Sequence, residues 1–344
     1  MTRRAALEEE MEATDTPMDA AAVRRALYAA HLRPNRALGQ NFCTDGARLA
    51  AMADAAAADG LPVLEIGPGL GALTEPLLLR APRVVAVEKD AALCAVLRAR
   101  LCAHERAGRL ALYAADILRF DVPGAMDGAP FAAAGNLPYY ITTPIAEYLL
   151  PLLPSSLTLM VQREAGERFF AGPGARVYGP LSVLTQLYYE PERLMDVPRG
   201  CFYPQPEVDS LVVRLARRRG APPEAPQRVL AFCRRAFSMR RKTLLNNLLP
   251  AGRPAPQGKS GGSAAAGARP APHRDGDPAG HAARPSASGK PPAGRDAAAA
   301  ARDDARAMQD AAAAALAALR LRSDVRAEAL APEDLLALLR LLPG

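Results

Sequence analysis

Cysteine, histidine and tryptophan are scarce in this chain, which has five, four and none of them among 344 residues. The cysteines form no C-x-x-C pair, and an odd number of scattered thiols indicates a reduced, cytoplasmic protein without a disulfide framework. The histidines lie too far apart for metal-ligand spacing. We therefore expect no chemistry that depends on a metal ion.

Long apolar runs are also missing. No stretch approaches the about 18 uninterrupted apolar residues that a membrane-spanning helix needs. The N-terminus has no apolar run, and Glu8, Glu9 and Glu10 are unlike a transit peptide, which is poor in acids. The sequence therefore predicts no membrane segment.

Basic residues exceed acidic ones, with 43 Lys and Arg against 36 Asp and Glu, a net charge of +7 and a pI of about 9.4. This excess fits a polyanionic partner such as nucleic acid. An arginine-rich solvated surface explains the charge equally well, so composition leaves both open.

Short apolar runs alternate with longer helical segments over the first two thirds of the chain. This alternation predicts βαβ units and a mostly parallel sheet, which binds ligands beyond the carboxyl ends of its strands. The predicted strands are Val63–Ile66, Val84–Glu88, Leu110–Ala114, Phe131–Ala134, Leu157–Val161 and Leu211–Leu215.

The chain divides by composition into four parts. They are an acidic extension over 1–30, an α/β domain over 31–220, a helical domain over 221–250 and 305–344, and an intervening segment over 251–304. The intervening segment is rich in Gly, Pro, Ala and Ser, so it cannot bury enough surface to offset its ordering entropy, and we expect disorder there. Residues 229–249 are predicted to form one helix with Cys233, Phe237, Leu244 and Leu248 as its core stripe.

Three strand ends carry ligand candidates. Gly67 opens a G-x-G-x-G turn that lacks the third glycine of the dinucleotide fingerprint, so it suits a nucleoside with an amino-acid tail. Glu88, at the next strand end, can accept both ribose hydroxyls, and Asp116 can accept from an adenine amine. The alternatives are a turn without ligand, a solvated strand end and an Asx turn.

A fourth strand end carries Asn136, Leu137, Pro138 and Tyr139. The exocyclic amine of adenine is a poor nucleophile, and two acceptors aimed at its hydrogens favour the pyramidal form. The Asn136 side-chain oxygen and the Leu137 carbonyl suit this task, because Pro138 restricts Leu137 to an extended conformation. Tyr139 offers a face for an extruded base. A proline turn with a packed tyrosine is the alternative.

Together these segments resemble the KsgA-type ribosomal RNA adenine dimethyltransferases. The resemblance covers residues 31–250 and returns at Arg326–Leu330. The matching strings are Leu38–Phe42, Glu65–Leu70, Asn136–Tyr139, Tyr178–Val183, Phe202–Pro206, Val208–Ser210 and Arg240–Thr243.

The resemblance implies a Rossmann-like S-adenosylmethionine-dependent methyltransferase with a small helical C-terminal domain, acting as a monomer. Its substrate would be two adjacent adenosines in the 3′-terminal hairpin loop of 16S ribosomal RNA, within the 30S subunit or its precursor. It implies that Phe202 packs on the flipped base opposite Tyr139. It also implies cofactor contacts at Asn41, Cys43, Gly67, Glu88, Asp116 and Asn136.

The basic residues of the predicted helix are candidates for RNA phosphate contacts, with an ordinary solvated face as the alternative. They are Arg234, Arg235, Arg240, Arg241 and Lys242. Three other functions compete: methylation of one adenine in large-subunit RNA, methylation of DNA adenine, and a binding module without turnover. No target-recognition domain for DNA is evident.

Overall fold

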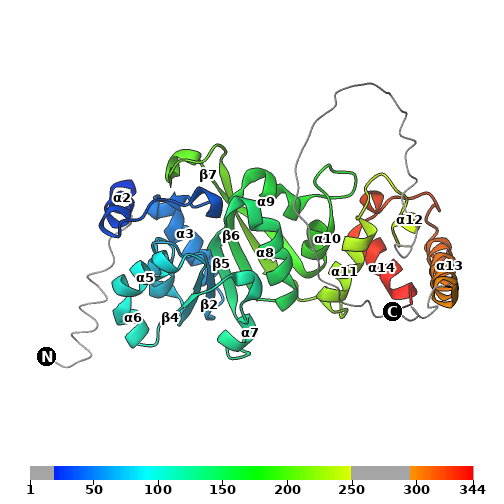
Figure 1. Ribbon diagram of the computed structural model, residues 1–344, viewed down its shortest axis with the longest axis horizontal. Helices are drawn as coiled ribbons and strands as arrows, with labels where there is room; N and C mark the ends of the chain where they lie inside the picture. Colours follow the sequence, from blue (N-terminus) through cyan, green and yellow to red (C-terminus); the bar gives the residue numbers. More distant parts are fainter. Residues whose placement is uncertain (1–18, 249–294, 344) are drawn as a thin grey trace, which may run out of the picture.

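The computed structural model describes residues 19–248 and 295–343, which centre on a seven-stranded sheet (Figure 1). The strand order is β4-β3-β2-β5-β6-β9-β7, with β2 to β6 parallel to one another and β9 antiparallel to both of its neighbours, β6 and β7. The strands are β2 (Val63–Ile66), β3 (Val84–Glu88), β4 (Leu110–Ala114), β5 (Ala132–Asn136), β6 (Ser156–Gln162), β7 (Tyr189–Val197) and β9 (Ser210–Arg217). The predicted α/β fold is confirmed.

The sequence predicted six of these strands and missed β7. Three have the predicted bounds, and the other three differ by one or two residues at their ends. Strand β7 lies at the edge of the sheet, where Pro191 costs no ladder hydrogen bond and charged side chains reach solvent. Its residues therefore lack the apolar run that marks an interior strand.

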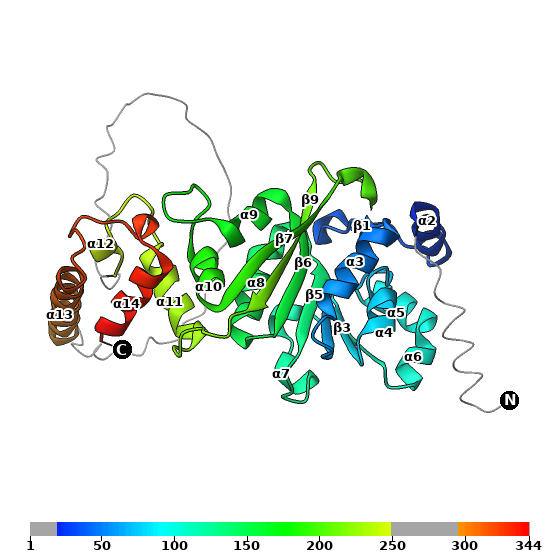
Figure 2. The ribbon, with the colours of Figure 1, turned by 180° about the vertical axis from the view of Figure 1, so that it is seen from behind.

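Both faces of the sheet are covered by helices, as Figure 2 shows from behind. Successive strand residues alternate between two hydrophobic clusters: Val63 packs with the helices on one face, and Leu64 with those on the other. The first face carries α3 (Gly46–Ala56), α4 (Thr74–Arg80) and α5 (Ala91–Arg100); the second carries α8 (Thr142–Leu149), α9 (Arg163–Phe170) and α10 (Pro180–Tyr188). Burial on both faces explains why the interior strands are mostly apolar.

Shorter elements complete the α/β part. They are α6 (Cys102–Arg106), α7 (Val122–Ala125), the paired strands β1 (Phe42–Cys43) and β8 (Phe202–Tyr203), and the 3-10 turns η1 (Arg36–Leu38), η2 (Ile117–Arg119), η3 (Tyr139–Ile141), η4 (Leu150–Leu152) and η5 (Arg199–Cys201).

The N-terminal helix α2 (Ala20–Ala29) begins at Asp19, whose carboxylate accepts from the Ala22 amide at 2.7 Å. Its buried face packs against Phe42, Leu70 and Leu93. Residues 19–30, assigned to an extension from the sequence, are therefore packed against the α/β part.

The C-terminal helices share one hydrophobic cluster with the sheet. Polar ties cross the same boundary: the buried Tyr178 hydroxyl donates to the Leu330 carbonyl at 2.9 Å, and the Tyr188 hydroxyl donates to the Glu224 carbonyl at 2.6 Å. The elements are α11 (Pro226–Ala236), α12 (Leu244–Leu248), α13 (Arg295–Ala318), η6 (Ala327–Ala329) and α14 (Pro332–Leu341).

The prediction of one helix over residues 229–249 is wrong, because α11 ends at Ala236 and α12 begins at Leu244. The buried Asn247 amide donates to the Ala236 and Met239 carbonyls, at 2.7 and 3.1 Å, and so satisfies acceptors at the end of α11. Its helix must fold back to reach them. Of the predicted core stripe, three residues are buried and Phe237 is partly buried against the same cluster.

Helix α13 begins at Arg295, ten residues before the predicted helical segment. Residues 295–304, assigned to the low-complexity segment, are helical because alanine and arginine, which fill seven of the ten positions, are good helix formers. Residues 1–18 and 249–294, including the rest of the predicted disordered segment, lie outside the described residues.

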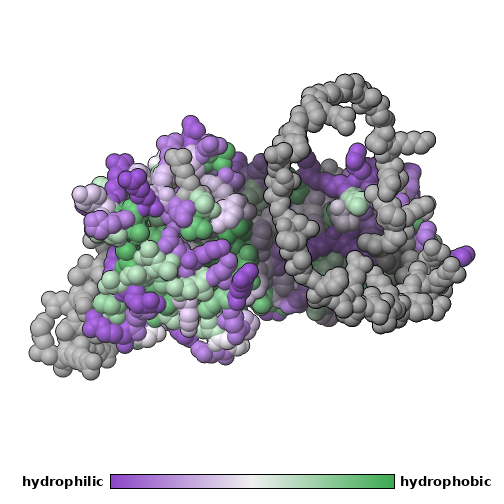
Figure 3. Space-filling view, in the orientation of Figure 1, coloured by the Kyte–Doolittle hydropathy of each residue, from purple (hydrophilic) through white to green (hydrophobic). Residues whose placement is uncertain are grey.

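No helix in the described ranges is long and apolar enough to cross a membrane. Figure 3 shows hydrophobic side chains over the sheet-bearing half of the face seen in Figure 1, with hydrophilic ones between and around them. Within residues 19–248 and 295–343, no group of three or more His, Cys, Asp or Glu side chains is placed to hold a metal ion.

Candidate active site

A cavity lies at the carboxyl ends of β2, β3, β4 and β5, where the fold predicts ligand binding. The segment 38–43 closes its opposite side. Among the predicted residues that line it are Asn41, Cys43, Gly67, Glu88, Asp116, Asn136, Leu137, Pro138 and Tyr139. Segments up to about one hundred residues apart therefore meet at one site.

The turn after β2 holds Gly67 and Gly69 at φ 67° and 58°, in the left-handed region that favours glycine. The Gly69 amide donates to Glu88 Oε2 at 2.9 Å, which ties the turn to the tip of β3. This geometry brings backbone and a carboxylate to the same wall of the cavity.

Glu88 is 7% exposed, and its second oxygen accepts from the Asp90 amide at 2.8 Å. Burial raises the pKa of Glu88, while the amide donors oppose the rise. Each carboxylate oxygen can accept more than one hydrogen bond, so Glu88 retains acceptor capacity for ligand hydroxyls.

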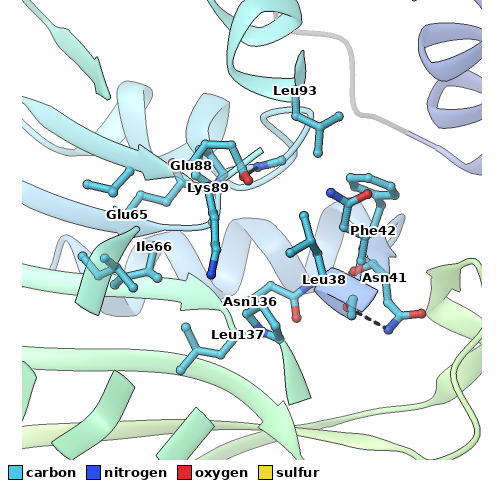
Figure 4. A pocket seen from close by; sticks show the side chains of 18 of the residues that line it. Leu38, Asn41, Phe42, Glu65, Ile66, Glu88, Lys89, Leu93, Asn136 and Leu137 are labelled. Carbon is cyan, nitrogen blue, oxygen red and sulfur yellow. Dashed lines mark hydrogen bonds between the residues drawn. The ribbon is translucent and has the colours of Figure 1, made fainter. Parts of the chain in front are cut away.

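Asp116 forms the Asx turn that was the alternative interpretation, and it also lies where a ligand contact was predicted. Its Oδ1 accepts from the Leu118 amide at 3.1 Å, as in an Asx turn, and its side chain also lines the cavity. Its Oδ2 accepts from Lys89 Nζ at 2.9 Å, and this bond is the main cause that lowers the pKa of Asp116. Figure 4 shows the Lys89 side chain extended into the cavity.

Asn136 ends β5 with a defined amide orientation. Its Nδ2 donates to the Asn41 carbonyl at 2.9 Å, so the amide nitrogen is engaged and Oδ1 is the free end of the group. The next residue, Leu137, donates its amide to the Met160 carbonyl at 2.9 Å, which anchors the backbone to β6. Pro138 is extended, at φ −57° and ψ 131°.

Tyr139 reaches across to the start of β9, where its hydroxyl lies 3.0 Å from Ser210 Oγ. Burial raises the pKa of the Tyr139 hydroxyl, so it stays protonated at neutral pH. The ring is only partly buried, which leaves surface for an aromatic ligand.

One predicted residue lies outside the cavity. Phe202 is 5% exposed and sits opposite Cys43 in the β1–β8 pair, with its side chain in the hydrophobic cluster under α3. In this structure it supports the wall that holds Cys43 rather than facing the cavity. The Cys43 thiol is also buried, and burial raises its pKa to about 11.

The sequence reasoning missed Glu65, Lys89 and Tyr140, which also line the cavity. Glu65 is 1% exposed, one of its oxygens has no hydrogen-bond partner among the described residues, and burial raises its pKa to about 8. A carboxylate inside an apolar strand was the available signal for Glu65. Lys89 and Tyr140 each follow a predicted site residue directly.

The predicted RNA-binding residues divide into two groups. Three have partners within the chain: Arg234 donates to Glu147 at 3.1 Å, Arg235 to the Leu248 carbonyl, and Arg240 to Glu328 at 3.1 Å. The other two, Arg241 and Lys242, are exposed and form no ion pair with another described residue.

Comparison with known proteins identifies the family. The family model described as ribosomal RNA adenine dimethylase matches residues 31–258. The ribosomal RNA small subunit methyltransferase A of Moorella thermoacetica is 42% identical over 231 residues, which are 63% of this chain and 79% of the relative. That of Geobacillus thermodenitrificans is also 42% identical, over 62% of this chain and 75% of the relative.

Two solved structures share the fold. A dimethyladenosine transferase from Plasmodium falciparum aligns with a TM-score of 0.57 and 21% identity, over 86% of this chain and 95% of that one. The 23S ribosomal RNA methyltransferase ErmE aligns with a TM-score of 0.53 and 24% identity, over 88% and 99%. With the matched model spanning most of the α/β part and the strand-tip residues in place, the chain belongs to the ribosomal RNA adenine dimethylase family.

Proposed function

We propose that this enzyme transfers methyl groups from S-adenosylmethionine to N6 of two adjacent adenosines in the 3′-terminal hairpin loop of 16S ribosomal RNA. Dimethylation would act on the 30S subunit or its precursor and contribute to small-subunit biogenesis. One observation carries the proposal: Asn136, Leu137, the Gly67 turn and Glu88 all line the same cavity, and the Asn136 amide oxygen is the free end of its group.

The cavity residues fit the cofactor. Glu88 can accept from the two ribose hydroxyls, and Asp116 can accept from the adenine amine. Glu65 adds a buried, unpartnered oxygen at the cavity wall, and the cavity's lysine is already neutralised by Asp116. An uncharged nucleoside with a cationic tail suits such a lining better than a pyrophosphate does.

When bound, S-adenosylmethionine supplies an electrophilic methyl group on its sulfonium. The protein holds the acceptor amine: Asn136 Oδ1 and the Leu137 carbonyl accept its two hydrogens and favour the pyramidal nitrogen. The bond from Asn136 Nδ2 to Asn41 keeps the oxygen end of the amide in place, which is preorganisation of the kind that stabilises a transition state. Tyr139 stacks on the adenine that has left its helix.

Arg241 and Lys242 are the best placed of the predicted RNA contacts, because they need not break an ion pair to another described residue before meeting a phosphate. We extend the proposal to Arg234, Arg235 and Arg240 only as weaker contacts. We place the activity in the cytoplasm, with a monomer as the acting species.

The deciding experiment uses the full chain with isotope-labelled S-adenosylmethionine and immature small subunits, followed by mapping of the modified bases. We expect two adjacent N6-dimethyladenosines near the 3′ end of 16S RNA, and none with Asn136→Ala. Large subunits and DNA are offered in parallel. Label in either of those substrates alone would refute the proposal.

A further inference from the structure

Tyr140 is an exposed aromatic residue at the mouth of the cavity. It is 53% exposed, and it lines the same cavity as its neighbour Tyr139. Among the large apolar residues that are exposed in the described ranges, no other lines this cavity. A single exposed tyrosine needs no explanation, but one at the mouth of an active site does.

The ring of Tyr140 lies against the turn before β1. A Cβ added to Gly39 would come within 3.2 Å of ring atom Cδ1 and 3.3 Å of Cε1. Gly39 has φ 61°, a conformation that glycine adopts without strain. The backbone of one cavity wall therefore approaches one edge of the ring closely, while much of the side chain remains open.

The two consecutive tyrosines differ in environment. The Tyr139 hydroxyl is tied to Ser210 and its ring is partly buried, whereas no hydrogen bond to another described residue holds the Tyr140 hydroxyl. Tyr139 can contact a base inside the cavity. Tyr140 can contact a group at the cavity mouth.

We propose that Tyr140 is the stacking platform for the nucleobase next to the target adenine, an inference that rests on the proposed RNA substrate. When one adenine leaves its stack to enter the cavity, its neighbour is left without a stacking partner and stays within one nucleotide of the mouth. An exposed aromatic face there restores that stacking, at roughly 1–3 kcal/mol per base. Where that neighbour is the second proposed target, Tyr140 holds it while the first target reacts.

The test compares Tyr140→Ala with Tyr140→Phe in the full chain, with immature small subunits as substrate. Loss of the ring should raise KM for RNA roughly 5- to 150-fold, the equivalent of one stacked base, and leave kcat and the Kd for S-adenosylmethionine within about twofold. Tyr140→Phe should remain within about twofold of the wild type. The matched control is Tyr28→Ala, which removes an 83% exposed tyrosine from α2.

A second readout reports on the neighbouring base directly. A hairpin RNA carries 2-aminopurine beside the target adenosine, and its fluorescence is quenched when the base stacks. Binding should quench it with the wild type and Tyr140→Phe and not with Tyr140→Ala, at RNA concentrations that saturate each protein.

Equal KM and equal quenching in wild type and Tyr140→Ala overturn this inference while leaving the proposed substrate intact. A parallel loss of cofactor affinity in Tyr140→Ala also overturns it, since the ring would then serve the cofactor. If the wild type does not methylate the small subunit at all, the proposed function fails first, and this inference fails with it.

Discussion

The cavity at the strand tips and the C-terminal helices differ in how closely the structure follows the sequence prediction. At the cavity, residues predicted from separate strand ends meet at one site, with carboxylates and amides held by backbone groups. In the C-terminal region, the segment predicted to be one helix forms the two helices α11 and α12. Three of the five predicted RNA-binding residues donate hydrogen bonds to groups of their own chain.

The difference follows from how the two regions are determined. The carboxyl ends of neighbouring parallel strands lie at the same end of a sheet. Predicting a strand therefore also predicts where a polar residue just after it will lie. A basic residue on a helix has no such constraint. Its role depends on which carboxylate or carbonyl of another element lies within reach.

The sharpest test of the cavity is Asn136→Ala. It removes the oxygen proposed to accept from the amine, so turnover should fall by roughly 10²–10³-fold or more, with RNA binding kept. Single-turnover methylation and an RNA-binding titration measure the two effects. Asn246→Ala, a change at an exposed amide in the helical region, should leave both intact. If Asn136→Ala and Asn246→Ala lowered turnover equally, the assignment of the amine-binding oxygen to Asn136 would be wrong.

Glu88→Gln should weaken S-adenosylmethionine binding by roughly 10- to 150-fold, because it removes the charge from acceptors of two proposed hydrogen bonds. Calorimetric titration of the cofactor gives the change, and a thermal melt of the free protein checks that the Gly69 turn survives. The control Asp127→Asn removes the charge of a surface carboxylate that pairs with Arg83, just before the amino end of β3, and should not alter affinity.

The helical region is tested by Arg241 and Lys242, which form no ion pair with another described residue. Arg241→Ala with Lys242→Ala should reduce the salt dependence of RNA binding, by about 0.7–0.9 in the log–log slope for each phosphate that the protein no longer neutralises. Arg234→Ala should reduce the slope less, because its guanidinium must leave its ion pair with Glu147 before it meets a phosphate. A larger effect from Arg234→Ala would show that ion pairs within the chain open on RNA binding.

The last prediction concerns Glu65 and the pH dependence of stability. Burial raises its pKa from 4.5 to about 8, so between these values the folded state binds a proton that the unfolded state has released. Stability should therefore fall as pH rises through this window, by up to about 1.4 kcal/mol per pH unit. Melting temperatures against pH measure the slope, and Glu65→Gln should flatten it. An unchanged slope in that variant would assign the dependence to other groups.

Local features of the fold could be predicted from the sequence, and features that depend on distant residues could not. The strands ending near Gly67, Glu88, Asp116 and Asn136 were predicted because apolar runs and turn residues are local signals. Strand β7 was missed because an edge strand lacks that pattern, and the break in α11–α12 was missed because it depends on Asn247 reaching the end of the preceding helix.

The amino-acid sequence by itself determined the α/β fold and the positions of the candidate ligand-binding residues at the strand ends. Hydrophobic periodicity and turn residues are local signals that a few consecutive residues carry. Only the tertiary structure decided that Phe202 faces the core, that Glu65 is a buried acid, and which arginines are already paired. The reason is physical: burial and charge pairing are properties of neighbours in space, and those neighbours come from distant parts of the chain.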